Sequence, residues 1–382
     1  MVYKILRIIV NIGLRAYFRK IFISGLERVP RDKPLLIACN HPSGFLEPII
    51  MACTFPKPLS FLVRGDLFSN ALLRPLLLST NQIPIFRFRD GFSSLKKNSE
   101  SIRMVVQVLR DHKPLLIFVE GSTKSVWKLR PLQKGMGRMA QQTLEEDPEL
   151  DLHVLPVGIT FTQTERQGSE IMLNVGEAYP IRPIFEDKSL KDPIAAFNDQ
   201  LFPKIQELTI DLRDPERDQY AMSTAMRDFF GQVSYQALPR FDTKFTPFPI
   251  FKALEAKLNA EVLDSKVRNQ SENTPPIQNG RLPLWVKMLW LVPGFLGVVL
   301  HLIPIGGALL LTNKLVSSKE FYSSILIALS MVFSILYYFN IFIITWITLG
   351  LLTSFVIVLA MILLGFCGVI FMEQRFTNTR MS

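Results

Sequence analysis

A long stretch near the C-terminus of this 382-residue chain has no charge at all. Residues 321–372 contain no Asp, Glu, Lys or Arg, although the whole chain has a formal net charge of +10. This run is more than twice as long as the roughly 20 apolar residues that cross the hydrocarbon core of a bilayer. A soluble domain has no comparable use for it, so the sequence predicts an integral membrane protein.

Cysteine and histidine are also scarce. The three cysteines, Cys39, Cys53 and Cys367, show neither paired nor metal-type spacing. This spacing argues against a disulfide framework and indicates small apolar residues in a reducing compartment. No cluster of Cys and His suggests a bound metal, so we expect neither a metal nor another cofactor. The N-terminus does not have the pattern of a secretory signal peptide, because Arg7 and Asn11 interrupt its apolar residues.

Residues 1–30 have the pattern of an amphipathic helix, with no acidic residue before Glu27. The positions that share its polar face are Lys4, Arg7, Asn11, Arg15 and Arg19. Such a helix can simply pack on the domain that follows. Its purely basic polar face instead favours a helix that lies on anionic lipid headgroups.

Residues 31–182 alternate short apolar runs with helical patterns. The predicted strands are Leu35–Ala38, Leu59–Val63, Gln82–Phe86, Leu115–Val119, Val154–Phe161 and Ile171–Val175. The predicted helices are 48–54, 68–78, 93–110 and 135–146. This alternation predicts an α/β core with a largely parallel sheet flanked by helices. The catalytic groups of such sheets gather at the carboxyl ends of the strands.

Three further segments follow the core. Residues 183–264 read as a helical extension, residues 265–282 as a polar linker, and residues 283–382 as a helical membrane region. Residues 288–313 are uncharged but contain prolines and glycines, which argues against a straight spanning helix. We therefore expect a re-entrant hairpin there and two crossings within 321–372.

The basic residues that flank the apolar runs favour this topology. With the hairpin, they would all lie on one side of the membrane, as the positive-inside rule favours. They are Lys287, Lys314, Lys319, Arg375 and Arg380. This arrangement would put the core domain and the C-terminus in the cytoplasm, and a topology of three spans stays open as the alternative.

One histidine stands out in the stretch CNHPSGFLEP, residues 39–48. His41 follows a predicted strand, in a loop that Pro42 and Gly44 keep irregular. Glu47 is close by and precedes Pro48, so we expect it at the N-cap of a helix. A carboxylate bonded to one imidazole nitrogen leaves the other nitrogen free as a base. The alternative is an incidental histidine beside a capping glutamate.

Cationic and hydroxyl-bearing residues follow two other predicted strands. Arg87 and Arg89 come after the third strand, and the stretch FVEGSTKS, residues 118–125, comes after the fourth. Ser122, Thr123 and Lys124 could offer hydroxyls, backbone N–H groups and a positive charge to a phosphate. Further cations near the start of the next helix are Arg130, Lys134 and Arg138. Each stretch alone can be an ordinary loop, whereas together they predict a cationic pocket beside His41.

The order of these stretches resembles a known family. NHPSGFLEP, IPIFR, FVEGSTKS and LPVG, within residues 34–160, are similar to the four blocks of glycerolipid acyltransferases related to 1-acylglycerol-3-phosphate acyltransferase. The chain departs from the family pattern at Glu47, where Asp is usual, and at Val119, where Pro is usual. Ser122 resembles an insertion, so Lys124 would stand in for the usual Arg.

The resemblance implies an O-acyltransferase of membrane phospholipid synthesis. His41 would be the general base and Glu47 would orient it, while Arg87 would hold the acceptor phosphate and Glu120 and Gly121 would shape that site. The donor would be acyl-CoA or acyl carrier protein, and the acceptor a glycerol phosphate or a lysophospholipid. We expect membrane lipids and an acyl thioester as partners, no nucleic acid, and no particular oligomeric state. The alternatives are a lyso-aminolipid acceptor and a non-catalytic lipid-binding or scaffold protein on the same fold.

Overall fold

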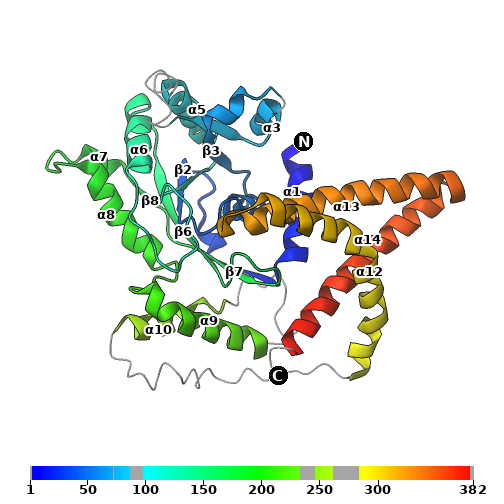
Figure 1. The fold of residues 1–382 in the computed structure, drawn as a ribbon. Helices are drawn as coiled ribbons and strands as arrows, with labels where there is room; N and C mark the ends of the chain where they lie inside the picture. Colours follow the sequence, from blue (N-terminus) through cyan, green and yellow to red (C-terminus); the bar gives the residue numbers. More distant parts are fainter. Residues whose placement is uncertain (1, 72, 87–97, 233–245, 261–283, 379–382) are drawn as a thin grey trace.

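The computed structural model describes residues 2–71, 73–86, 98–232, 246–260 and 284–378. It has a central sheet with helices around it and three long apolar helices that extend to one side (Figure 1). Arg87 and the predicted linker 265–282 lie outside the described residues.

The sheet is largely parallel, as predicted. Its strands are β1 (Lys20–Ser24), β2 (Leu35–Cys39), β3 (Ser60–Arg64), β4 (Gln82–Ile85), β5 (Leu115–Phe118), β6 (His153–Phe161), β7 (Glu170–Val175) and β8 (Tyr179–Pro180). Their order is β1-β7-β6-β2-β5-β3-β4, and β8 pairs with β6. Only the pairings of β6 with β7 and β8 are antiparallel among the described strands. Strand β1 falls in the segment expected to be membrane-associated, and it extends the sheet by pairing with β7.

The helices of the soluble part follow the predicted alternation with strands. They are α1 (Val2–Tyr17), α2 (Leu46–Thr54), α3 (Leu73–Ser79), α5 (Asn98–Arg110), α6 (Gly135–Glu146), α7 (Arg182–Glu186), α8 (Pro193–Gln206), α9 (Pro215–Gln232) and α10 (Phe248–Asn259), with 3₁₀ turns at Leu26–Arg28 and Gly65–Ser69. The predicted helix 93–110 begins at Asn98 in the described part.

Apolar cores cover both faces of the sheet, and β2 contributes to both. Leu35 and Ile37 face a core that includes residues of α1 and α2, whereas Leu36 and Ala38 face a core with residues of α5, α6 and α8. All four side chains are fully buried. Successive side chains of a strand point to opposite faces, so a strand covered on both sides must be apolar throughout. Burying each leucine or isoleucine contributes about 1.5–3 kcal/mol.

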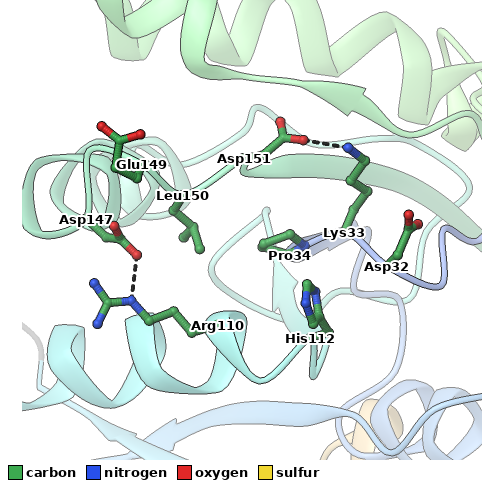
Figure 2. A pocket seen from close by; sticks show the side chains of 9 residues that line it. All are labelled: Asp32, Lys33, Pro34, Arg110, His112, Asp147, Glu149, Leu150 and Asp151. Atoms are coloured by element: carbon green, nitrogen blue, oxygen red, sulfur yellow. Dashed lines mark hydrogen bonds and ion pairs between the residues drawn. The ribbon is translucent and has the colours of Figure 1, made fainter.

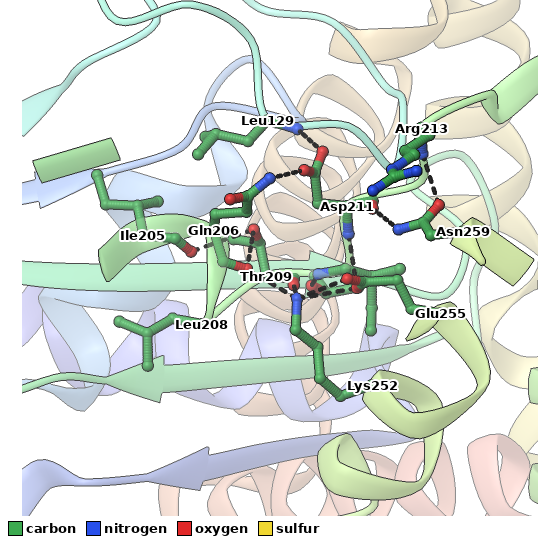
Figure 3. A network of polar contacts seen from close by, with 12 residues as sticks. Leu129, Ile205, Gln206, Leu208, Thr209, Asp211, Arg213, Lys252, Glu255 and Asn259 are labelled. Atoms are coloured by element: carbon green, nitrogen blue, oxygen red, sulfur yellow. Dashed lines mark hydrogen bonds and ion pairs between the residues drawn. The ribbon is translucent and has the colours of Figure 1, made fainter. Parts of the chain in front are cut away.

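The helical extension is joined to the core by a polar network (Figure 3). Lys252 Nζ on α10 donates to the carbonyl oxygens of Gln206 and Thr209, both at 2.8 Å, and to the Glu255 carboxylate. Glu255 accepts from the Asp211 N–H at 2.8 Å, and Asp211 accepts from the Leu129 N–H at 2.8 Å. The extension and the core are therefore held together through residues that follow α8.

Residues 288–313 form part of one continuous helix, where the sequence predicted a re-entrant hairpin. Helix α12 (Leu284–Leu315) runs through this segment without reversing, and α13 (Lys319–Leu349) and α14 (Leu351–Asn378) follow it. Helix α12 bends markedly along its length (Figure 1), and it contains Pro293 and Pro304. Proline removes one helical hydrogen bond and kinks a helix without ending it when neighbouring helices support the kink. Three segments are long and apolar enough to cross a membrane: Leu291–Leu315, Glu320–Leu349 and Leu351–Met372.

Close backbone contact joins α12 to α14. A Cβ atom at Gly297 would lie 1.9 Å from the Leu364 carbonyl oxygen, so only glycine fits there. Small residues allow membrane helices to approach closely and gain van der Waals contact. A hydrogen-bonded pair, His301 Nε2 and Tyr338 OH at 2.6 Å, joins α12 to α13.

Helix α1 lies where the soluble part meets the long helices (Figure 1). Its side chains Ile5, Ile8 and Ile12 are exposed. Two basic residues expected on lipid headgroups instead make contacts within the protein. Arg7 donates to the carbonyl oxygens of Cys53 and Phe55, and Arg19 is buried and 3.4 Å from Glu170. The exposed isoleucines thus give α1 an apolar surface next to the long apolar helices.

We predict that Gly297→Ala weakens the packing of α12 on α14, because the added methyl group must displace backbone. Overpacking of this kind costs about 1–3 kcal/mol. The thermal midpoint of the detergent-solubilised protein should therefore fall. Gly306→Ala is the matched control, since a Cβ there has no neighbour within 4 Å. Equal midpoints for the two variants would contradict the close contact.

Candidate active site

The histidine singled out from the sequence lies at the carboxyl end of β2. Strands β5 and β6 flank β2 on either side, so the loops that follow all three strands meet at one edge of the sheet. Asn40 fixes the chain just before His41. Its Nδ2 donates to the Ile159 carbonyl at 2.9 Å and its Oδ1 accepts from the Ile159 N–H at 2.8 Å.

The structure brings His41 and Glu47 together. His41 Nδ1 lies 3.6 Å from Glu47 Oε2, and neither atom has a hydrogen-bond partner in the described structure. This separation is longer than a hydrogen bond, but catalytic contacts are often long before substrate binds. The imidazole stacks on the Phe118 ring, with centroids 4.1 Å apart and an interplanar angle of 12°. With Nδ1 directed to Glu47, Nε2 is the nitrogen left for a substrate.

Glu47 is completely buried, and its backbone differs from the prediction. We expected it at the N-cap, but Phe45 has that position and Glu47 lies in the first turn of α2. Proline is tolerated in a first turn because the N–H that it lacks has no helical partner there. The carboxylate reaches back to the loop and accepts from the Ser43 N–H. Burial raises the pKa of Glu47, while its interactions with His41 and Ser43 oppose that rise.

Glu120 joins two loops at this edge of the sheet. Its Oε2 accepts from the His41 N–H at 2.8 Å and from Arg130 Nη2 at 2.9 Å, and its Oε1 accepts from the Arg130 N–H at 2.8 Å. Only 5% of Glu120 is exposed. Through these contacts, Glu120 connects the His41 backbone to Arg130 in the loop that follows β5.

The remaining predicted binding residues divide into two groups. Ser122 Oγ accepts from Arg130 Nη1 at 2.7 Å, and Gly121 has a φ of 69° that glycine readily adopts. Lys124 stays beside the histidine: its N–H donates to the His41 carbonyl at 3.3 Å and its side chain is exposed. Thr123, between them, is partly exposed. Lys134, by contrast, points to α8, where its Nζ lies 2.8 Å from Asp192 Oδ2.

A cleft of about 420 Å³ opens beside the loop that contains His41. Asn40 and Pro42 border it on one side, and the end of β6 and the loop that contains Trp127 form its walls. Thr209 and Ile210 of the helical extension line it as well, which explains why the polar network of Figure 3 matters for the site. The sequence did not predict that residues after 183 would contribute to this cleft.

A second cavity lies at the opposite edge of the sheet (Figure 2). Pro34 and His112 line it just before β2 and β5 begin. Its charged groups are paired, with Lys33 2.6 Å from Asp151 and Arg110 2.6 Å from Asp147. None of its lining residues belongs to the site around His41, so the two are separate. Within the described ranges, no three His, Cys, Asp or Glu side chains gather as a metal site.

Three contributors to the site were not expected from the sequence. Asn40 and Phe118 hold His41, and Ser43 supplies an N–H to Glu47. Asn40 and Ser43 lie within the quoted histidine motif, so their positions were the available signal. Nothing in the sequence marked Phe118 as the residue under the imidazole.

Part of the chain is similar to known acyltransferases. The acyltransferase family model matches residues 20–160. A 1-acyl-sn-glycerol-3-phosphate acyltransferase of Borreliella burgdorferi is 25% identical over 138 residues, which is 36% of this chain and 53% of the relative. The chain thus spans about half the length of this curated relative. The crystal structure of the 1-acyl-sn-glycerophosphate acyltransferase PlsC from Thermotoga maritima is 17% identical, with a TM-score of 0.39 over 53% of this chain and 79% of that chain.

Residues 20–160 are therefore an acyltransferase domain, with the His41 loop inside it. The motifs that resemble glycerolipid acyltransferases thus fall in the part of the chain that matches the acyltransferase family model.

We predict that Glu47→Gln separates activity from stability. The Gln carbonyl can still accept from Ser43, but its amide would donate to His41 Nδ1 and leave the proton on Nε2, the wrong nitrogen for a base. Acyl transfer should fall by about 10²–10⁴-fold.

The stability of Glu47→Gln, unlike its activity, should not fall at pH 7. Because the folded pKa of Glu47 is raised above its ordinary value of 4.5, the folded state loses stability as pH rises from that value through the folded pKa. Gln removes this penalty. The thermal midpoint of Glu47→Gln at pH 7 should equal or exceed that of the wild type, and this advantage should shrink below about pH 4.5. A large fall in the midpoint at pH 7 would show that Glu47 mainly supports the fold.

Proposed function

We propose that this protein transfers a fatty acyl group from an acyl thioester to a hydroxyl of a glycerol phosphate or lysophospholipid. The observation that carries the proposal is the pair His41 and Glu47 within an acyltransferase domain. Nδ1 faces a buried carboxylate at 3.6 Å, and the loop borders an open cleft. The donor would be acyl-CoA or acyl carrier protein, with no metal or other cofactor needed.

The chemistry requires one base and balances without a cofactor. His41 Nε2 takes the proton of the acceptor hydroxyl as its oxygen attacks the thioester carbonyl carbon. The C–O bond forms, the C–S bond breaks, and the leaving thiolate takes the proton from the imidazolium. Glu47 stabilises that imidazolium while it exists and holds the ring through Nδ1.

An exposed cation beside the histidine supports a phosphate-bearing acceptor. Lys124 has an exposed side chain, and its backbone contacts the His41 carbonyl. We propose that Lys124 and Arg87 bind the phosphate, and that Ser122 and Thr123 border it. Glu120 and Gly121 would shape this site from the loop that follows β5.

A specific observation favours a second candidate acceptor, a lyso-aminolipid without a phosphate. Two cations expected to bind phosphate are paired inside the protein: Arg130 with Glu120 at 2.9 Å and Lys134 with Asp192 at 2.8 Å. This pairing lowers the positive charge available for a dianion. A scaffold protein without catalysis is the remaining alternative.

We further propose that the acyltransferase domain faces the cytoplasm. The donors expected for this reaction are cytoplasmic thioesters, and the basic residues between α12 and the start of α13, which contacts the His41 loop, favour that side. Among these, Lys314 lies in the last turn of α12.

An acyl-transfer assay on membranes that contain the full chain tests the function. Acyl-CoA and acyl carrier protein donors should each be offered with glycerol 3-phosphate, lysophosphatidate or a lyso-aminolipid. We expect an acylated product with a phosphate-bearing acceptor, and a loss of about 10²–10⁴-fold in His41→Ala.

The matched control is His112→Asn at the opposite edge of the sheet. His112 has a φ of 51°, which Asn tolerates better than most residues. This variant should keep its activity. Product from the lyso-aminolipid alone would support the second acceptor, whereas normal transfer by folded His41→Ala would refute the mechanism.

A further inference from the structure

The start of α13 lies directly against the catalytic loop. The Gly44 N–H donates to the Glu320 carbonyl at 3.0 Å, and Ser43 Oγ donates to the same oxygen at 3.3 Å. The rings of Phe45 and Phe321 are in contact, with centroids 5.5 Å apart. Two consecutive residues of the loop between His41 and Glu47 are thus hydrogen-bonded to a helix more than 270 residues away in sequence.

One buried hydroxyl of the same turn joins several parts of the site. Ser323 is fully buried; its Oγ accepts from Tyr17 OH at 2.6 Å and donates to the Thr164 carbonyl at 2.6 Å. The Thr164 side chain is in turn 2.6 Å from Ser125 Oγ. Thr164 and Ser125 both line the cleft. Burial raises the pKa of Tyr17 to about 12, so its phenol keeps the proton that it donates.

Gly44 shows how closely the helix approaches. A Cβ atom at this position would lie 2.3 Å from Phe321 Cε1. The backbone of Gly44 is not in the left-handed region, so the demand for glycine comes from this contact. The loop therefore fits against α13 with no room for a methyl group.

We propose that the first turn of α13, residues 319–323, is a positioning element of the active site. The Glu320 carbonyl and the Phe321 ring hold the loop that sets the distance between His41 and Glu47, and the Ser323 hydroxyl anchors this turn to Tyr17 and Thr164. This turn lies outside residues 20–160, which match the acyltransferase family. The acyltransferase domain thus depends on an apolar helix for its catalytic geometry. The activity readout of this inference rests on the proposed function.

A double-mutant cycle at Gly44 and Phe321 tests the contact in the full chain. In Gly44→Ala the methyl group should push the loop from Phe321 and lower kcat by about 10²-fold, since a displacement of about 1 Å can have that effect. The KM values should change little, because the change acts on His41. In the Phe321→Ala background, which has space for the methyl group, Gly44→Ala should cost less than about threefold.

The control substitution is Gly135→Ala at the start of α6, where a Cβ meets nothing within 4 Å. It should leave kcat and KM unchanged. A Gly44→Ala effect that is equally large with and without Phe321 would overturn the proposal. So would full activity of Gly44→Ala itself.

Hydrogen exchange provides a readout without activity. Ser323→Ala leaves the buried Tyr17 hydroxyl and the Thr164 carbonyl without their partner, so the Gly44 amide should exchange at least about tenfold faster. Amides of β6 should keep their wild-type exchange rates. Unchanged exchange at Gly44 would contradict the proposal. If the wild-type protein transfers no acyl group, the proposed function fails, while the exchange result still decides whether α13 holds the loop.

Discussion

The site depends on one buried carboxylate. Glu47 is completely enclosed, and a charge in such surroundings is costly unless donors or a countercharge compensate it. The two groups that face it are the Ser43 N–H and the His41 imidazole. Both come from the loop just before α2, so the loop must fold back over the start of that helix. The same loop conformation therefore compensates the charge of Glu47 and orients the His41 ring.

The rest of the fold holds this loop from several sides. Asn40 ties its beginning to β6, and Glu120 ties the His41 backbone to the loop after β5. The carbonyl of Glu320 in α13 ties its middle. Because these partners come from distant parts of the chain, the loop gains its conformation from the assembled fold. The first turn of α13 thereby supports the same loop as the sheet does.

The sequence predicted the sheet well because apolar runs and their spacing depend on local chemistry. His41 and Glu47 were also recognisable, since both lie in one short motif at the end of β2. What could not be predicted depends on long-range contacts. Three features join residues that are far apart in sequence. They are the pairing of Lys134 with Asp192, the hydrogen bond of Ser323 to Thr164, and the contribution of the segment after α8 to the cleft. Residues 288–313 form one helix in place of the expected hairpin because the prolines there kink α12 without ending it and Gly297 lets α12 pack closely on α14.

The central claim is that Glu47 keeps the Nδ1 of His41 protonated and leaves Nε2 free as the base. The ¹⁵N chemical shifts of the imidazole nitrogens measure this tautomer directly in the full-length, detergent-solubilised protein. The chain has only four histidines, so comparison with a His41 variant assigns the signals. The account predicts that the neutral His41 ring carries its proton on Nδ1 and leaves Nε2 unprotonated. A proton on Nε2 with a bare Nδ1 would contradict it.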